Sequence, residues 1–190
     1  MSTPSARKVT SGDLLISDVE LTDGIFARSV VVLLDADDYG ALGVVVNKLS
    51  ETPLGRVLPS WVPVTSPPQV LFAGGPVSPE GAICLAALAD EDDEPPGWRR
   101  VFSNIGLLHL DTPIEIVTGA YRDVRIFAGY AGWDPHQLDA ELARGSWHVA
   151  RARYADVFGD DPDHHWRRAL RRLPGPEAYL STWTPDPENN

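Results

Sequence analysis

The chain has 190 residues, of which 43% are hydrophobic, and this suits one globular domain with a substantial buried core. Its 27 acidic and 16 basic residues give a formal net charge of -11, and a surface with that charge repels nucleic-acid backbones and anionic lipid headgroups. Cys84 is the only cysteine, which excludes an intrachain disulfide and a cysteine-rich zinc site.

The first predicted elements are an N-terminal arm and three strands. We expect residues 1–11 to form a loose arm, followed by a strand over 13–17. Two apolar runs without alternation, VVVLL and VVV, predict strands over 29–35 and 41–47 that are covered on both faces. The turn-rich link at 36–40 lies between them, so the two strands are predicted to pair as an antiparallel hairpin.

The rest of the chain contains further strand patterns and four helix-start signals. Strands are predicted over 69–73, 83–88, 105–108, 125–130 and 147–151. A capping oxygen directly before proline predicts a helix start, because the cap satisfies an orphan N–H and proline has none to satisfy. This pair begins at Thr52, Thr112, Asp134 and Asp161. The helices are short and do not alternate with the strands as regular βαβ units, so we predict an α+β fold.

The segments outside these elements are rich in proline or in acidic residues. Residues 59–68 form a proline-rich connector, and residues 90–96 form an acidic, solvated loop. The polar tail 184–190 has no apolar residue and is expected to lie on the surface. We expect a single domain over 1–190. We also expect a cytoplasmic protein, because no apolar run approaches ~20 residues and the N-terminus does not resemble a signal peptide.

The motif GWDPHQ has a functional and a structural interpretation. In the first, Trp133, Gln137 and Glu141 line one edge of a pocket. In the second, Asp134 is a helix N-cap and forms a capping box with Gln137. Trp133 then packs on Leu138 as a hydrophobic staple. The structural interpretation accounts for nearly every residue of the motif.

A glycine pair, Gly74 and Gly75, follows one of the predicted strands. Its backbone N–H groups can cradle an anion, or the pair can mark a tight turn forced by the proline that follows. Neither of the two common phosphate-binding patterns accompanies it, so the turn is the favoured interpretation.

Polar residues flank the first predicted hairpin. Asp23 and Arg28, in the segment DGIFAR, can pair with each other or hold a loop. Asn47 ends the strand GVVVN, where a buried amide must find hydrogen-bond partners. We interpret Asn47 as a strand terminator that bonds the backbone.

Signals for catalysis and for metal binding are weak. There is no G-x-S-x-G nucleophile elbow, and His109, His136 and His148 are isolated in sequence. The run from Asp160 to His165 resembles a metal cluster, but Asp161 also begins a helix, and the spacing matches no known site. We therefore expect no metal and no cofactor, and we assign no catalytic residue.

The last predicted helix, over 164–172, has two different faces. The apolar face carries Trp166, Ala169, Leu170 and Leu173, and the opposite face carries Arg167, Arg168, Arg171 and Arg172. The arginines are interpreted as a solvated face that pairs with the acidic loop, or as a contact for an acidic partner or nucleic acid. No helix-turn-helix or RNA-recognition signature supports nucleic-acid binding.

Three blocks of the sequence, each an apolar run with glycines at fixed offsets, carry a resemblance to a known family. They are Gly12–Asn47, Leu71–Val77 and Phe127–Leu142. Together and in this order they resemble the AlgH/YqgE family of small bacterial proteins, and the tail from Tyr179 resembles its actinobacterial branch. The resemblance implies a bifurcated, mainly antiparallel β-sheet that forms a pseudo-barrel with short flanking helices.

What the resemblance implies about function is limited. Family members are soluble bacterial proteins, mostly without a defined activity, and some carry a transcriptional-regulator label tied to alginate synthesis. Many relatives have a Glu-His pair where this chain has Asp35 and Ala36. A role that depends on that histidine therefore does not transfer to this chain.

Our leading hypothesis is a non-enzymatic protein that binds a small molecule or a protein partner in a cleft between the three blocks. The residues expected to line the cleft are Asp23, Arg28, Asn47, Gly74, Gly75, Tyr130, Trp133 and Gln137. The alternative is a small hydrolase or transferase whose site is assembled from the same blocks. We expect no direct sequence-specific DNA binding and no membrane contact, and a monomer or weak dimer.

Overall fold

The computed structural model describes residues 7–185 and places ten strands in one sheet. The strands are β1 (Asp13–Ser17), β2 (Val30–Asp37), β3 (Gly40–Val45), β4 (Leu49–Pro53), β5 (Val70–Ala73), β6 (Val77–Leu88), β7 (Trp98–Phe102), β8 (Ile105–Leu108), β9 (Tyr121–Trp133) and β10 (Trp147–Arg151). The α-helices are α1 (Leu54–Val57), α2 (Ile114–Val117), α3 (Gln137–Ala143), α4 (Tyr154–Phe158) and α5 (His165–Leu170). Three 3-10 helices, η1 (Gly24–Phe26), η2 (Pro59–Val64) and η3 (Gly175–Thr182), complete the elements.

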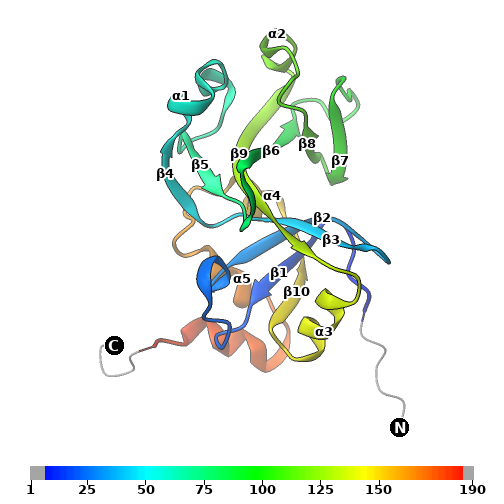
Figure 1. Ribbon diagram of the computed structural model, residues 1–190, viewed down its shortest axis with the longest axis vertical. Helices are drawn as coiled ribbons and strands as arrows, with labels where there is room; N and C mark the ends of the chain where they lie inside the picture. The colour runs from blue at the N-terminus through cyan, green and yellow to red at the C-terminus, as the bar shows by residue number, and fades with distance from the viewer. Residues whose placement is uncertain (1–6, 186–190) are drawn as a thin grey trace.

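The sheet divides at β9, the longest strand. The strand order is β10-β1-β2-β3-β9-β6-β8-β7. Off this path, β5 pairs with β9, and β4 pairs with the other edge of β5. The β5–β9 pair is parallel, and all other pairs are antiparallel. The end of β9 at 131–133 pairs with β3, whereas its earlier residues pair with β6. In Figure 1, β9 runs from the upper half, which carries α1 and α2, into the lower half, which carries α3 and α5. This curled, mainly antiparallel sheet with short helices confirms the predicted α+β fold.

The first hairpin is buried on both faces, as its unbroken apolar runs predict. Val30 and Val32 lie in the central hydrophobic cluster with Phe72, Phe127 and the residues of α5, including Trp166. The alternate residues of β2, Val31 and Leu33, lie in a second cluster that packs under α3. Successive side chains of a strand point to opposite faces, so a strand covered on both sides has to be apolar throughout.

A third cluster fills the upper half and accounts for the lone cysteine. Leu54 of α1, Trp61 of η2 and Val117 of α2 close over one face of β6. Cys84 lies in this cluster, and burial raises the pKa of its thiol far above the usual range. Cys84 is therefore a small side chain of the buried core.

The predicted strands are largely present, but two edge strands were not predicted. β1, β8 and β10 have the predicted bounds, while β6 and β9 extend well beyond the predicted 83–88 and 125–130. β4 reads LSETP and β7 reads WRRVF, and each pairs on one side only. Edge strands tolerate proline and exposed charge, so their sequences lack the apolar pattern that identifies a central strand.

The four helix-start signals lie beside helices, but the caps of three differ from the prediction. At the fourth, Asp161 Oδ1 accepts the backbone N–H of His164 at 3.3 Å, as a capping oxygen does, although α5 begins at His165. Pro53 and Pro113 are themselves the N-caps of α1 and α2, so no side-chain oxygen caps either helix. At α3 the N-cap is His136, which has a left-handed φ of 65°. Only half of the predicted capping box forms there, because Gln137 Oε1 accepts the backbone N–H of Asp134 at 3.0 Å while the Asp134 side chain caps nothing.

The described end of the expected loose arm, residues 7–11, is attached to the fold. Val9 is 5% exposed and belongs to the cluster under α3, and Arg7 and Lys8 form ion pairs with Asp13 and Asp38. Residues 1–6 of the arm and 186–190 of the predicted tail lie outside the described residues. Within 7–185, no helix is long and apolar enough to cross a membrane.

Candidate ligand-binding site

The three glycine-marked blocks meet where β3, β5 and β9 come together, as the sequence predicts. Ala41 of β3 pairs with Trp133 of β9. The backbone N–H of Val45 donates to the carbonyl oxygen of Gly74 at 2.8 Å, and the N–H of Gly74 donates to Ala128 of β9 at 2.8 Å. Segments far apart in sequence are therefore joined by backbone hydrogen bonds at the point where the sheet divides.

The glycine pair allows this close crossing of backbones. A Cβ atom on Gly74 would lie 2.4 Å from the carbonyl oxygen of Gly129, and one on Gly75 would lie 2.1 Å from the backbone of Tyr130. Glycine is required at both positions because any side chain would collide with main-chain atoms. The N–H of Gly74 is already bonded to the Ala128 carbonyl oxygen and does not point to a ligand. The geometry therefore favours a packing role for the glycine pair over an anion-binding role.

Asn47 and Arg28 lie together at the far end of the first hairpin. The Asn47 amide accepts the N–H of Val30 at 2.9 Å and donates to the carbonyl oxygen of Arg28 at 3.0 Å. Asn47 is thus the backbone-bonding terminator that the sequence predicts, and it holds Arg28 at a left-handed φ of 52°. Asp23 is exposed and forms no ion pair with Arg28 among the interactions of residues 7–185.

Next to this pair is a cleft of about 420 Å³, which we call the cationic cleft. One wall is formed by the segment that joins β3 to β4, and the other by α5 and the loop before it. Its lining residues are Arg28, Asn47, Lys48, Leu49, Pro162, Asp163, Trp166 and Arg167. Three cationic side chains thus share the cleft with a single carboxylate, in a protein whose net charge is -11.

The hydrogen bonds that position these cations come from neutral groups. Lys48 Nζ donates to the carbonyl oxygen of Ala27 at 2.8 Å, and Arg167 Nη1 donates to that of Ser181 at 2.7 Å. The Arg28 guanidinium lies over the rings of Trp166 and Trp183, at 6.0 and 5.4 Å from their centroids.

The three cations of the cleft lack acidic partners. Over the described part of the chain, no carboxylate lies within ion-pair distance of Arg28, Lys48 or Arg167. Burial and the nearby charge of Arg28 lower the pKa of Lys48. Asp163 is the single carboxylate of the lining, so the cleft keeps an excess of positive charge that can accept an anion.

Trp133 and Gln137, by contrast, take part in a hydrogen-bonded cluster around Glu141. The Glu141 carboxylate accepts the indole N–H groups of Trp133 and Trp147 at 3.0 and 2.8 Å. It also accepts the side-chain N–H of Gln137 at 3.0 Å. Because all these donors are satisfied by one acceptor, the motif supports the structural interpretation of GWDPHQ, with Leu138 in the same apolar cluster as Trp133.

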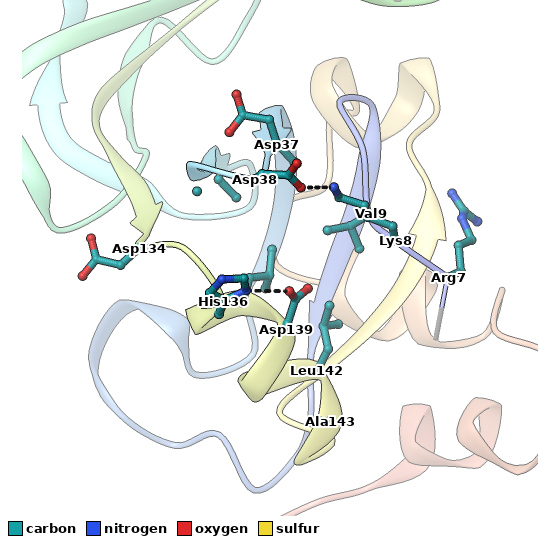
Figure 2. A pocket seen from close by; sticks show the side chains of 14 residues that line it. Arg7, Lys8, Val9, Asp37, Asp38, Asp134, His136, Asp139, Leu142 and Ala143 are labelled. Carbon is teal, nitrogen blue, oxygen red and sulfur yellow. Dashed lines mark hydrogen bonds and ion pairs between the residues drawn. The ribbon is translucent and has the colours of Figure 1, made fainter. Parts of the chain in front are cut away.

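A second cleft, of about 440 Å³, lies between the N-terminal segment, the β2–β3 turn and α3. We call it the acidic cleft, because Asp37, Asp38, Asp134 and Asp139 line it. Figure 2 shows Lys8 reaching Asp38 and His136 beside Asp139, and the latter two side chains are 3.8 Å apart. Its charged lining residues also include Arg7, Asp37 and Asp134. Ala36 lines this acidic cleft, but none of the eight predicted site residues does.

The predicted site residues therefore divide into separate groups. Asn47 lies six residues beyond Ala41, the partner of Trp133, and this corresponds to roughly 20 Å along a strand. Arg28 and Asn47 line the cationic cleft, Trp133 and Gln137 bond to Glu141, and the glycine pair lies with Tyr130 at the crossing. Lys48 was not among the predicted site residues, and its one signal in the sequence is its place directly after the buried strand GVVVN.

The acidic and histidine-rich run before α5 has structural partners. Asp161 forms ion pairs with His164 and Arg168, and His165 turns inward to Asp156. Among residues 7–185 no group of three or more His, Cys, Asp or Glu side chains is arranged to hold a metal ion. Asp161, His164 and His165 of this run are instead paired with neighbouring side chains.

The arginine face of the last helix is only partly solvated. Its apolar residues are buried in the central cluster, as predicted. Of the four arginines, Arg168 pairs with Asp161 and Arg172 with Asp156. The acidic loop pairs elsewhere, through Glu94 and Arg100, so the expected pairing of that loop with the last helix is wrong.

Known proteins match this chain over nearly its whole length. The AlgH-like family model matches residues 14–178. A UPF0301 protein of Streptomyces coelicolor is 42% identical over 183 residues, which cover 95% of each chain. A UPF0301 protein of Thermobifida fusca is 41% identical over 193 residues, which cover 97% of each chain.

Two solved structures share the fold of this chain, and one of them is an AlgH protein. The crystal structure of a protein from Corynebacterium diphtheriae has a TM-score of 0.87 at 28% identity and covers 94% of this chain and 95% of that one. The solution structure of the AlgH protein from Pseudomonas aeruginosa has a TM-score of 0.69 at 26% identity, covering 98% of this chain and all of that one. With a family model over 14–178 and relatives 41% and 42% identical across nearly its full length, the chain belongs to the AlgH-like family.

Proposed function

We propose that this protein is a non-enzymatic binding protein that holds a small anionic molecule in the cationic cleft. The observation that carries the proposal is the meeting of Arg28, Lys48 and Arg167 without a carboxylate partner among the residues described. Arg168 and Arg172, which are close to Arg167 in sequence, do pair with carboxylates and lie outside the cleft lining.

Electrostatics favour an anionic occupant. Like charges that share a partly buried site raise each other's energy, and the interaction strengthens as water is removed. A phosphate or carboxylate relieves this repulsion and accepts several charge-assisted hydrogen bonds from guanidinium groups. The contacts of Asn47 and the two tryptophan rings position Arg28 before any ligand arrives, which lowers the entropy cost of binding.

The hydrolase or transferase alternative has no comparable support. The two half-buried or buried histidines, His148 and His165, are bonded to Asp18 and Asp156 and do not line the cationic cleft. No residue of the cleft is placed as a nucleophile beside a histidine base, which is the arrangement that activated serine or cysteine requires.

Thermal unfolding in inorganic phosphate tests the proposal. We expect phosphate to raise the unfolding midpoint above that in sodium chloride of equal ionic strength, because a ligand of the folded state stabilises it by mass action. Arg28→Gln should abolish the increment. Arg171→Gln, which removes the same charge from an exposed position outside the cleft, should retain it. Equal increments in both variants would refute binding in the cleft.

A further inference from the structure

The chain contains two lysines, and their surroundings are opposite. Lys8 is exposed and forms an ion pair with Asp38 beside other carboxylates of the acidic cleft, and this pairing raises its pKa. Lys48 is half-buried beside Arg28 and Arg167 and has no carboxylate partner within 7–185. One lysine is thus held as an ammonium ion, while the other lies where the ammonium form is disfavoured.

The geometry of Lys48 suits a nucleophile. Its Nζ donates one hydrogen bond, to the carbonyl oxygen of Ala27 at 2.8 Å, and a neutral amine can keep this bond while its lone pair remains free. The amine lines a cleft of about 420 Å³, room enough for a small molecule. Arg28 and Arg167 line the same cleft and can hold the anionic group of that molecule while its reactive carbon meets the amine.

We propose that Lys48 forms a reversible imine with a small aldehyde or α-oxo acid whose carboxylate or phosphate is held by Arg28 and Arg167. The inference rests on the proposed function, because the anion site selects the carbonyl compound. It goes further by assigning a covalent binding residue and by restricting the ligand to anions that carry a reactive carbonyl group.

The step is balanced without an oxidant or a reductant. The Nζ lone pair attacks the carbonyl carbon and forms the C–N bond, and the π electrons of the carbonyl group move to oxygen, which takes up a proton. The resulting carbinolamine loses its hydroxyl group as water, with a proton from nitrogen, as the C=N bond forms. Hydrolysis reverses the sequence and releases the ligand.

The charges around Lys48 favour the neutral amine that the attack requires. Burial first, and the charge of Arg28 second, lower its pKa, so a larger fraction is unprotonated near neutral pH than for an exposed lysine. Arg167 and Asp163, one group of each sign, are the other charged side chains that line the cleft. The arrangement matches the general pattern of a lysine activated by desolvation and a neighbouring cation.

Reductive trapping with glyoxylate, using the full-length chain, tests the inference. Imine formed in the presence of cyanoborohydride becomes a stable secondary amine, which peptide mass mapping assigns to one lysine or the other. We expect Lys48 to be labelled faster than Lys8, because its pKa is lowered and that of Lys8 is raised, so Lys48 has the larger fraction of neutral amine. Equal labelling, or preference for the more exposed Lys8, would overturn the inference.

Two controls separate the imine from the anion site. Acetaldehyde carries no charge, so the preference for Lys48 should be smaller with it than with glyoxylate, and Arg28→Gln should remove that difference while Arg171→Gln retains it. Lys48→Arg, checked for folding by thermal unfolding, should lose the adduct at this position. If phosphate stabilises the protein through Arg28 but the two lysines label equally, the imine fails and anion binding stands. If phosphate has no effect and glyoxylate shows no advantage over acetaldehyde, both proposals fail.

Discussion

At the scale of single residues, the buried carboxylate of Asp156 links α4 to α5. Asp156 and His165 are each 5% exposed, and their side chains are 2.9 Å apart. Arg172 Nη1 donates to both carboxylate oxygens, at 2.6 and 2.7 Å, and the backbone N–H of Arg153 donates at 2.7 Å. Burial acts to raise the pKa of Asp156, but the hydrogen bonds from His165 and Arg172 outweigh it and hold the pKa below its usual value.

The lowered pKa of Asp156 predicts a pH-dependent contribution to stability. The contribution is complete above the unfolded-state pKa of about 3.9 and is lost as the pH falls through the lower folded-state value. We expect Asp156→Asn to cost about 3 kcal/mol at pH 7, because Arg172 loses its partner, and the cost to shrink in acid below about pH 4. Urea unfolding across this pH range measures it, with the exposed Asp160→Asn as control. A cost that is independent of pH would contradict the assignment.

At the scale of secondary-structure elements, the crossing of β5 and β9 joins the two halves of the sheet. β5 pairs with β9 through Phe72 and Ala73, and the next residue, Gly74, passes directly over the carbonyl oxygen of Gly129. The obstructing atoms belong to the main chain, so a side chain at Gly74 cannot be accommodated by a change of rotamer. The crossing therefore depends on two glycines that are 55 residues apart in sequence.

Alanine substitutions test how far the crossing depends on close approach. Gly74→Ala places a Cβ atom 2.4 Å from the Gly129 carbonyl oxygen and 2.9 Å from Phe127 Cβ, and we expect a loss of about 3 kcal/mol or more. Gly55→Ala, in α1, meets only the Val62 side chain at 3.6 Å and should be neutral or stabilise by up to about 1 kcal/mol. Chemical unfolding of both variants gives the comparison. Similar stabilities would show that the crossing is not tightly packed.

At the scale of the whole molecule, positive charge is concentrated on a surface that is acidic on average. The net charge is -11, yet the cationic cleft gathers three cations, while two arginines of the last helix are neutralised by Asp161 and Asp156. The acidic cleft lies near the opposite end of β3. A small anion therefore finds several cations together at the cationic cleft.

Nucleic-acid binding should accordingly be weak and non-specific. Of the four arginines on the last helix, Arg167 and Arg171 have no carboxylate partner in the part of the chain that the structure describes. Two phosphate contacts give a log–log salt slope of about -1.8 on B-DNA, half the value of about -3.6 for four contacts. Gel-shift titration at several salt concentrations measures the slope. Sequence-selective binding that persists at moderate salt would support a direct regulatory role and contradict this prediction.

Structural features that depend on a local sequence pattern were predicted from the sequence, and features that depend on tertiary contacts were not. The unbroken apolar runs of β2 and β3 specified buried strands because the pattern depends on burial alone. The polar edge strands β4 and β7 were missed, since an edge is defined by the absence of a neighbour, which sequence does not record. Asp134 was predicted as the N-cap of α3, but the N-cap is His136. The left-handed backbone of His136 delays the helix start to Gln137, and capping motifs do not encode such a residue.

The candidate site was predicted in part for the same reason. Arg28 and Asn47 belong to one hairpin, so a local argument could propose them together. Lys48 and Arg167 line one cleft only because α5 packs against β1 and β2, which brings together residues 119 positions apart in sequence. Trp133 was separated from Asn47 by the length of β3, which the shared glycine signals of the three blocks did not reveal.

The binding of an anion in the cationic cleft is tested most directly by titrating inorganic phosphate into isotopically labelled protein and following the amide signals by NMR. We predict saturable shifts that gather at Arg28, at Lys48 and at Arg167, and at the side-chain amide of Asn47, which joins Arg28 to the strand. Signals from the acidic cleft, such as those of Asp38 and His136, should stay in place. Shifts that fail to saturate, or that gather around Asp38 and His136, would contradict the proposed site.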